Sequence, residues 1–304
     1  MKTILITGAT AGIGRHAALE LVRQGHHVIA TGRREHALVA LAEEARAIGR
    51  GKLEGIRLDV CDEANVREVA AEVLERTGGT GIHVLVNNAG YGQMGPLEEV
   101  SDAELRKQYD TNVFGLMNVT RAFLPQLRAN VGRGEGTPTI VNVSSIGGRV
   151  TFPLMGAYNS TKYAVESLSD ALRRELAPFG IAVSLVEPGP IRTEFNDTAM
   201  ATIDHGRVGG SVYAPVVAQA EKFRAQFEKQ SAGPEVTTRA IVHAVTARRP
   251  RVRYVVPFSS AAMLAIMSWL PTRVVDWAMR LMSGLTPKTL RSAAAPALPA
   301  RATT

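Results

Sequence analysis

Three side chains near the middle of the chain have the types and spacing for proton transfer to a carbonyl group. Tyr158 and Lys162 are four residues apart, which places them on one face of a helix, and Ser145 lies thirteen residues before the tyrosine. Moving a tyrosine pKa from about 10 to about 7 requires about 4 kcal/mol. An ammonium about 4 Å away supplies approximately that at an effective dielectric constant of about 20. We therefore expect Lys162 to make Tyr158 a general acid and base, while Ser145 donates a hydrogen bond to the substrate oxygen.

A glycine-rich turn near the N-terminus has the pattern of a dinucleotide site. The segment Thr7–Gly14 reads T-G-A-T-A-G-I-G, follows the apolar run Ile4–Ile6 and opens a helical pattern. Glycines there let the backbone approach a pyrophosphate, and the N-terminus of the helix meets the negative charge. Glycines are also common in ordinary turns. The prediction of a dinucleotide site therefore depends on the position of these glycines between a strand and a helix. A nicotinamide dinucleotide would supply the hydride that accompanies the proton from Tyr158.

The end of the second predicted strand bears on which dinucleotide binds. An NAD site places a carboxylate there, about 20 residues after the glycine turn, whereas an arginine suits the 2′-phosphate of NADP. The strand ends Ala30-Thr31-Gly32-Arg33-Arg34, without Asp or Glu. Because guanidinium groups bind phosphate in a bidentate manner, we predict NADP(H) in preference to NAD(H). The alternative is that Arg33 and Arg34 are solvated residues at the start of a helix.

Short apolar runs alternate with helical periodicity along the chain. This alternation predicts an α/β fold, a single doubly wound Rossmann-type parallel sheet with helices on both faces. The predicted strands cover residues 3–7, 27–31, 53–58, 82–87, 138–143, 181–187 and 251–256. The predicted helices cover residues 12–24, 35–48, 62–76, 102–129, 157–178, 212–230 and 235–248.

The chain divides into one catalytic domain and a C-terminal extension. We expect residues 1–257 to form a Rossmann-type NADP-binding catalytic domain. Within it, we expect the long connection 190–234 to be an active-site lid. Residues 258–285 form two apolar helices, separated at Pro271 and packed on the same domain. These helices could add to the core, form a subunit contact, cover an apolar substrate as a lid, or attach the protein to a membrane surface. Neither helix is long enough to span a bilayer. The Ala- and Pro-rich tail 286–304 is expected to be flexible.

Composition narrows the classes of partner and compartment. With 304 residues and 45% hydrophobic content, the chain can bury one sizeable core but is too short for two full α/β domains. Its single cysteine, Cys61, excludes an internal disulfide and predicts a cytoplasmic protein. The net charge of +7 is scattered apart from a cluster at Arg248–Arg253, and no nucleic-acid motif accompanies it. The histidines lack metal-ligand spacing, so we predict neither a nucleic-acid partner nor a metal site.

Further motifs give the chain a resemblance to the short-chain dehydrogenase/reductase family. Together with Thr7–Gly14 they follow the family's order and spacing over residues 1–195. They are Asn87-Asn88-Ala89-Gly90, Asn112 within Thr111-Asn112-Val113, Ser144-Ser145, Tyr158-x-x-x-Lys162, and Pro188-Gly189 with Thr193. The stretch 85–195 looks most like the hydroxysteroid-dehydrogenase-like branch of the family.

The resemblance implies a role for each matched position. The residues along the dinucleotide would be Gly8, Gly12, Ile13 and Gly14 at the pyrophosphate, Asp59 and Val60 at the adenine, Asn88 and Ala89 at the adenine ribose, and Pro188 and Thr193 at the nicotinamide carboxamide. The family's catalytic four match Asn112, Ser145, Tyr158 and Lys162. Asn112 would help to hold a water that relays protons to Lys162.

These observations predict an NADP(H)-dependent oxidoreductase that interconverts a secondary alcohol and a ketone. The segment 147–156 carries the apolar side chains Val150, Phe152, Leu154 and Met155 just before the tyrosine, which favours a lipophilic substrate. The alternative is a catalytically idle nucleotide-sensing or scaffold protein on the same fold, although such proteins usually lose the tyrosine or the lysine. The family often dimerises through the helices predicted here at 102–129 and 157–178, so we expect a homodimer or homotetramer.

Overall fold

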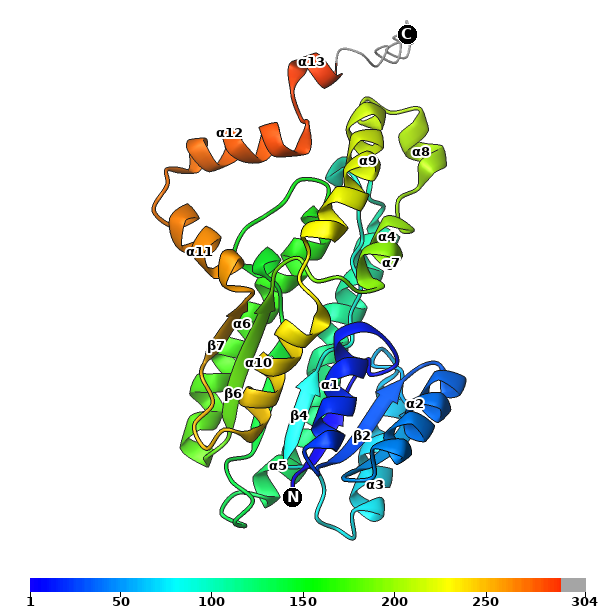
Figure 1. Ribbon diagram of the computed structural model, residues 1–304, viewed down its shortest axis with the longest axis vertical. Coiled ribbons are helices and arrows are strands. Elements are labelled where there is room, and N and C mark those ends of the chain that lie inside the picture. The colour runs from blue at the N-terminus through cyan, green and yellow to red at the C-terminus, as the bar shows by residue number, and fades with distance from the viewer. Residues whose placement is uncertain (291–304) are drawn as a thin grey trace, which may run out of the picture.

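A single seven-stranded parallel sheet forms the centre of the protein (Figure 1). The computed structural model describes residues 1–290, with the backbone alone for residues 223–230. The strands are β1 (Thr3–Ile6), β2 (His27–Gly32), β3 (Lys52–Arg57), β4 (Val84–Asn87), β5 (Thr139–Val143), β6 (Ala182–Pro188) and β7 (Arg253–Val256). Their order is β3-β2-β1-β4-β5-β6-β7, so the direction of winding reverses between β1 and β4. This confirms the predicted doubly wound α/β fold.

Helices cover both faces of the sheet, which explains why the central strands β1, β4 and β5 are buried along their whole length. On β1, Ile4 and Ile6 join the core beneath α1 (Gly12–Arg23), α2 (Glu35–Ile48) and α10 (Pro234–Thr246). Leu5 points the other way, into the core beneath α3 (Glu63–Arg76), α5 (Leu116–Ala129) and α6 (Gly156–Leu176). A parallel strand buried on both sides carries a continuous apolar run rather than an alternating one.

The predicted helix over 102–129 is interrupted. It consists of α4 (Asp102–Tyr109), a π-helical segment at Asp110–Gly115, and α5. Ser101 begins α4 with a capping box, in which its hydroxyl accepts from the Glu104 N–H and the Glu104 carboxylate accepts from the Ser101 N–H. The wider π turn contains Asn112, and such bulges are frequent at functional sites. The seven predicted strands agree with the structure to within two residues at each end.

The connection after β6 contains more helix than predicted. In addition to α9 (Ala214–Gln230), it forms α7 (Phe195–Met200) and α8 (His205–Gly209). The two short helices lie above the carboxyl ends of the strands (Figure 1). A single parallel bridge between Ile191 and Ala232 brings the two ends of the connection together.

The C-terminal extension is not additional core, so that interpretation of residues 258–285 is wrong. It forms α11 (Phe258–Met267) and α12 (Thr272–Ser283), followed by α13 (Pro287–Leu290). Ser260 is the only buried residue of α11, and α12 buries none. The helices turn away from the sheet, and α12 and α13 contact α9 instead (Figure 1). Of the tail predicted at 286–304, residues 291–304 lie outside the described residues.

No helix among the described residues has the length and apolar character needed to cross a bilayer.

Candidate active site

A cleft of about 1210 Å³ lies along the carboxyl ends of the strands. Its walls include residues that directly follow β1 to β6, which is where an open parallel sheet places its ligands. All the predicted site residues line it except Gly14 and Asn112. The lining set is Gly8, Gly12, Ile13, Arg33, Arg34, Asp59, Val60, Asn88, Ala89, Ser145, Tyr158, Lys162, Pro188 and Thr193.

The glycine turn is packed so closely that side chains would not fit. Gly8 and Gly12 have φ values of +66° and +51°, in the left-handed region that favours glycine. A Cβ on Gly14 would lie 2.5 Å from the Gly8 carbonyl oxygen and 2.4 Å from Asn88 Nδ2. Gly14 therefore acts by packing behind the turn, while the exposed backbone of Gly8 and Gly12 faces the cleft.

Asn88 and Ala89 support that turn from the next strand. The Asn88 side-chain amide donates to the carbonyl oxygens of Thr7 and Gly8, at 3.0 and 3.1 Å. The Thr7 hydroxyl accepts from the backbone N–H groups of Asn88 and Ala89, both at 3.0 Å. The carboxyl ends of β1 and β4 are thus joined by side chains as well as by the sheet.

Two guanidinium groups lie where β2 ends. Arg34 donates weakly to the Thr10 hydroxyl at 3.3 Å, whereas Arg33 forms no ion pair with any described residue. Both side chains are exposed and line the cleft. Asp59, which also lines the cleft, accepts from the Cys61 N–H at 3.0 Å through its carboxylate. This end of the cleft therefore presents positive charge next to the glycine turn.

Tyr158, Lys162 and Ser145 converge at the other end of the cleft. Tyr158 and Lys162 lie on one face of α6, with Lys162 Nζ 5.7 Å from the centre of the phenol ring. Lys162 donates to the Val143 carbonyl oxygen at 2.9 Å. Ser145 begins a short 3₁₀ turn after β5, where its hydroxyl accepts from the Gly147 N–H at 3.0 Å. The phenol and the ammonium thus share one wall of the cleft.

Burial, rather than the lysine, dominates the pKa of the tyrosine. Desolvation raises the pKa of Tyr158 to about 12, although a hydrogen bond with Ser145 lowers it in part. Desolvation likewise lowers the pKa of Lys162 to about 8, against the charge of Glu166, which raises it. The direction for Tyr158 is opposite to the one predicted from sequence, because burial disfavours the charged form of both groups. The polypeptide alone does not make Tyr158 acidic.

Asn112 lies behind the cleft instead of lining it. Its amide nitrogen donates to the Tyr91 carbonyl oxygen at 3.0 Å and to the Thr161 hydroxyl at 3.1 Å. Its oxygen accepts from the Tyr91 N–H at 3.2 Å. Asn112 thereby connects the loop after β4 to the turn of α6 that carries Lys162. Its predicted role in holding a water stays a prediction.

A buried charge cluster behind Lys162 was not predicted. Glu187, on β6 directly before Pro188, is fully buried and pairs with Arg149 at 3.3 Å and Arg253 at 3.1 Å. Arg253 also pairs with Glu166, one turn after Lys162, at 3.0 Å. Burial, reinforced by Glu166, raises the pKa of Glu187 to about 7. The feature of the sequence that could have indicated this cluster is Glu187 itself, a carboxylate within the mainly apolar strand β6.

The wall beside Tyr158 is apolar and comes from several segments. Phe152 and Met155 line the cleft as predicted, whereas Leu154 packs into a separate cluster with Ile203 and Val208. Val150 is buried and does not line the cleft. The remaining apolar lining side chains in this part include Met94, Phe195, Met200, Met263 and Met282. The Phe195 ring of α7 lies 5.4 Å from the Tyr158 ring.

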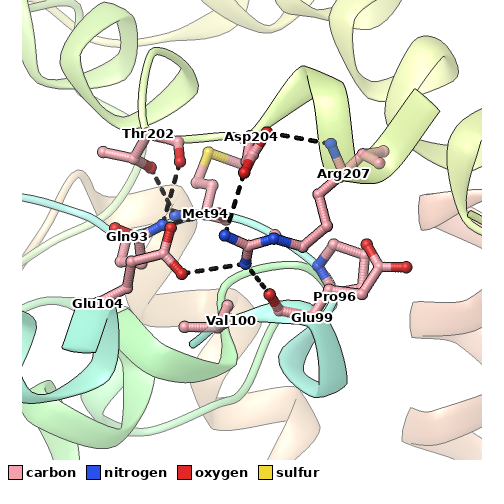
Figure 2. A pocket seen from close by; sticks show the side chains of 11 residues that line it. Gln93, Met94, Pro96, Glu99, Val100, Glu104, Thr202, Asp204 and Arg207 are labelled. Atoms are coloured by element: carbon pink, nitrogen blue, oxygen red, sulfur yellow. Dashed lines mark hydrogen bonds and ion pairs between the residues drawn. The ribbon is translucent and has the colours of Figure 1, made fainter. Parts of the chain in front are cut away.

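Arg207 of α8 links the connection 190–234, the predicted lid, to neighbouring segments (Figure 2). The guanidinium forms ion pairs with Glu104 of α4 and with Asp204, both at 3.1 Å, and also donates to the Glu99 carbonyl oxygen. Nearby, the Thr202 hydroxyl accepts from the Met94 N–H at 2.9 Å. These contacts hold the connection against the segment before α4. On its inner side, Thr193 approaches the glycine turn at Gly12.

The chain is similar in sequence and in structure to known dehydrogenases and reductases. The family model for short chain dehydrogenases matches residues 2–204. The uncharacterized oxidoreductase YbbO of Escherichia coli K12 is 38% identical over 275 residues, which are 90% of this chain and 93% of YbbO. The NADPH-dependent 3-dehydrocapnine reductase of Ornithobacterium rhinotracheale is 32% identical over 281 residues, 91% of this chain and 95% of that one. The crystal structure of a short-chain dehydrogenase from Streptomyces avermitilis gives a TM-score of 0.71 at 32% identity, covering 94% of this chain and 99% of that one.

Proposed function

This chain belongs to the short-chain dehydrogenase/reductase family and is an NAD(P)-dependent oxidoreductase, and we propose that it uses NADP(H) to interconvert a secondary alcohol and a ketone on a lipophilic substrate. One observation carries the proposal. A single cleft has two arginines and a glycine turn at one end, and Tyr158 with an apolar wall at the other. A phosphorylated dinucleotide and an apolar ketone would therefore meet beside the phenol.

The residues at the basic end fit a dinucleotide with an additional phosphate. The glycine turn has no room for a Cβ at Gly14, and the positive φ values of Gly8 and Gly12 leave backbone facing the cleft. Arg33 and Arg34 would bind the 2′-phosphate, because β2 ends in no carboxylate that would repel it. The related reductase of Ornithobacterium rhinotracheale is NADPH-dependent by name. When bound between these residues, the dinucleotide would supply the hydride for reduction and accept it in oxidation.

Tyr158 is the proton donor in the direction of ketone reduction. With a pKa of about 12 the phenol is neutral at physiological pH, which is the form that can protonate a developing alkoxide. Ser145 donates its hydroxyl hydrogen to the same oxygen as negative charge grows. The Lys162 ammonium, with a pKa of about 8, stabilises the phenolate that remains. Asn112 positions the turn that carries Lys162, through its hydrogen bonds with Tyr91 and Thr161, and its part in holding the water that returns the proton belongs to the proposal.

The apolar wall defines the class of substrate. Phe152, Met155, Phe195 and Met200 surround the space beside Tyr158 with side chains that cannot hydrogen-bond to sugar hydroxyls. Methionine adapts its shape to apolar ligands of different outline. We therefore propose a ketone or secondary alcohol carried on a hydrocarbon skeleton.

The assembly and location proposed for the enzyme are a homodimer or homotetramer in the cytoplasm. Phe114 is 57% exposed beside α5, and Tyr163 is 44% exposed on α6, so both outer helix faces present aromatic groups. Scattering from the purified protein measures the assembly. A monomer at micromolar concentration would contradict it.

The test is a screen that follows the absorbance of the reduced nicotinamide. Hydrophobic cyclic and long-chain ketones should be turned over with NADPH, and sugars should not. Tyr158→Phe should lose turnover by about a thousandfold or more and keep its affinity for NADPH. Tyr163→Phe, at an exposed tyrosine five residues further along the same helix, should behave as wild type. Full activity in Tyr158→Phe would refute the mechanism, and NADPH binding without turnover of any substrate would support the idle sensing or scaffold alternative.

A further inference from the structure

The C-terminal extension exposes an apolar surface that the folded domain does not cover. We call residues 258–290, with α11, α12 and α13, the C-terminal arm. Its large exposed hydrophobic side chains are Phe258, Ile266, Trp269, Leu270, Val274, Trp277, Leu281 and Met282. Trp269 is 89% exposed and Trp277 58%, and these are the only two tryptophans of the chain. A patch of this size on one segment marks a binding surface.

We propose that the C-terminal arm docks on an anionic lipid bilayer and places the mouth of the cleft at the membrane surface. The proposal deepens the proposed function, because it rests on the substrate being lipophilic. The arm would lie along the interface, since neither of its main helices is long enough to span it.

The pattern of α12 is that of a helix lying in an interface. Val274, Trp277 and Leu281 are spaced three and four residues apart, so they form one exposed apolar stripe. Arg273, Asp276 and Arg280 follow the same spacing along the neighbouring side of the helix. An amphipathic helix with tryptophan on its apolar face and arginine beside it is the arrangement that enters the headgroup region.

The charges of the arm favour anionic lipids. Arg273, Arg280 and Lys288 are its basic residues, and Asp276 is its only acidic one. Within the described part of the chain, none of the three basic side chains forms an ion pair with a carboxylate. They are therefore free to contact lipid phosphates. Basic groups beside a membrane are attracted to an anionic leaflet, and with three basic residues and one acidic residue on the arm we expect a preference for anionic vesicles of about tenfold or more.

The arm is also part of the cleft, which gives docking a consequence. Ser260 packs against Gly189 next to Pro188, where a Cβ on the glycine would lie 2.0 Å from the serine hydroxyl. Further along the arm, Met263 and Met282 line the cleft, and Met282 is 75% exposed. The apolar lining thus continues from the wall of the cleft to the exposed surface of the arm. A lipophilic substrate could pass from the bilayer into the cleft over these side chains.

Vesicle binding by the full chain tests the proposal without any enzymatic assay. The probes are phosphatidylcholine vesicles with and without phosphatidylglycerol, and the readouts are flotation and intrinsic fluorescence. Because both tryptophans lie on the arm, docking on the anionic vesicles should shift the emission of the whole protein to shorter wavelength. Ile266→Asp combined with Leu281→Asp should weaken binding by about a hundredfold. Val39→Asp, a matched change at an exposed valine of α2, should not weaken it.

Three outcomes would contradict the proposal. Wild-type protein that stays unbound, with unchanged emission, would show that lipid does not cover the arm. A dimer that dissociates in the Ile266→Asp, Leu281→Asp variant would assign the face to a second copy of the chain. Arg273→Glu with Arg280→Glu should abolish the preference for anionic vesicles, and a retained preference would refute the role of charge. The Ile266→Asp, Leu281→Asp variant should still turn over a water-soluble ketone. Activity without vesicle binding would show that docking is lost and the proposed chemistry is intact, whereas inactivity of the wild-type protein would contradict the proposed function and not the docking.

Discussion

Lys162 and Tyr158 lie one helical turn apart on α6, with the ammonium 5.7 Å from the centre of the phenol ring. The hydrogen bond from Lys162 to the Val143 carbonyl oxygen holds the ammonium at this position. At this separation and an effective dielectric constant of about 20, the ammonium stabilises a phenolate by about 3 kcal/mol. Burial opposes such stabilisation: desolvation raises the pKa of Tyr158 to about 12, although a hydrogen bond with Ser145 lowers it in part. The charge of Lys162 is therefore not enough to offset the burial of the phenol.

Replacing Lys162 with methionine should move the pH dependence of catalysis. Loss of about 3 kcal/mol of stabilisation corresponds to an upward shift of about two units in the apparent pKa of Tyr158. Alcohol oxidation at neutral pH, which requires the phenolate, should slow by about a hundredfold. The measurement is kcat/KM against pH in the direction of oxidation. Lys107→Met, on the exposed side of α4, is the control, and an unshifted profile in Lys162→Met would remove the lysine from the acid–base step.

The strands and the cleft residues were predictable because local sequence determines them. Each strand is an apolar run between helical patterns, and a parallel sheet places the residues after its strands at one edge. Gly8, Arg33, Asn88 and Pro188 therefore came together as expected. A local sequence pattern does not indicate how far folding removes a side chain such as Tyr158 from water. Burial raises the pKa of Tyr158, and one of the side chains packed on it is Phe195, which belongs to a different helix later in the chain.

Other features escaped prediction because long-range contacts stabilise them. The helices α7 and α8 are only six and five residues long, too short for intrinsic propensity to specify. Arg207 holds α8 through Glu104, which lies about a hundred residues earlier. The apolar pattern of α12 predicts a helix with a buried face but does not indicate what buries it. In this structure the folded domain leaves that face exposed.

Arg33 should set the cofactor preference. It lines the cleft without an ion partner among the described residues, so its guanidinium is available to a 2′-phosphate. Arg33→Ala should raise KM for NADPH by about 10–100-fold, the value of a charge-assisted hydrogen bond, and change KM for NADH by no more than about twofold. Arg46→Ala, on the exposed side of α2, is the control. If Arg33→Ala kept the full preference for NADPH, the phosphate would have to bind elsewhere.

Gly14 should tolerate no side chain, although its backbone φ is ordinary. An alanine Cβ would meet the Gly8 carbonyl and the Asn88 amide well inside contact distance, so the turn would have to move. We expect Gly14→Ala to destabilise the protein by about 1–3 kcal/mol and to weaken NADPH binding. Thermal unfolding and titration of nicotinamide fluorescence measure the two effects. Gly209→Ala, where a Cβ meets nothing within 4 Å, should leave both unchanged.

Glu54 should make the stability of the sheet edge sensitive to acid. Burial raises its pKa, but hydrogen bonds from Lys52, His27 and Arg76 outweigh burial and lower the pKa to about 2 from the ordinary value of 4.5. A carboxylate with a depressed pKa stabilises the fold fully above 4.5, and that contribution is lost as the pH falls from 4.5 through about 2.

Glu54→Gln keeps the shape of the side chain and removes its charge, so the two proteins should differ in a pH-dependent way. The side chains of Lys52 and Arg76 are 63% and 43% exposed, and solvent therefore screens part of the interaction. We expect a loss of about 2 kcal/mol in the free energy of unfolding at neutral pH, measured by urea denaturation. The difference from wild type should shrink as the pH is lowered below 4.5, because the wild-type carboxylate then takes up a proton. Glu43→Gln, at an exposed position of α2, should match wild type throughout. A constant difference at every pH would mean that shape and not charge accounts for the effect of Glu54.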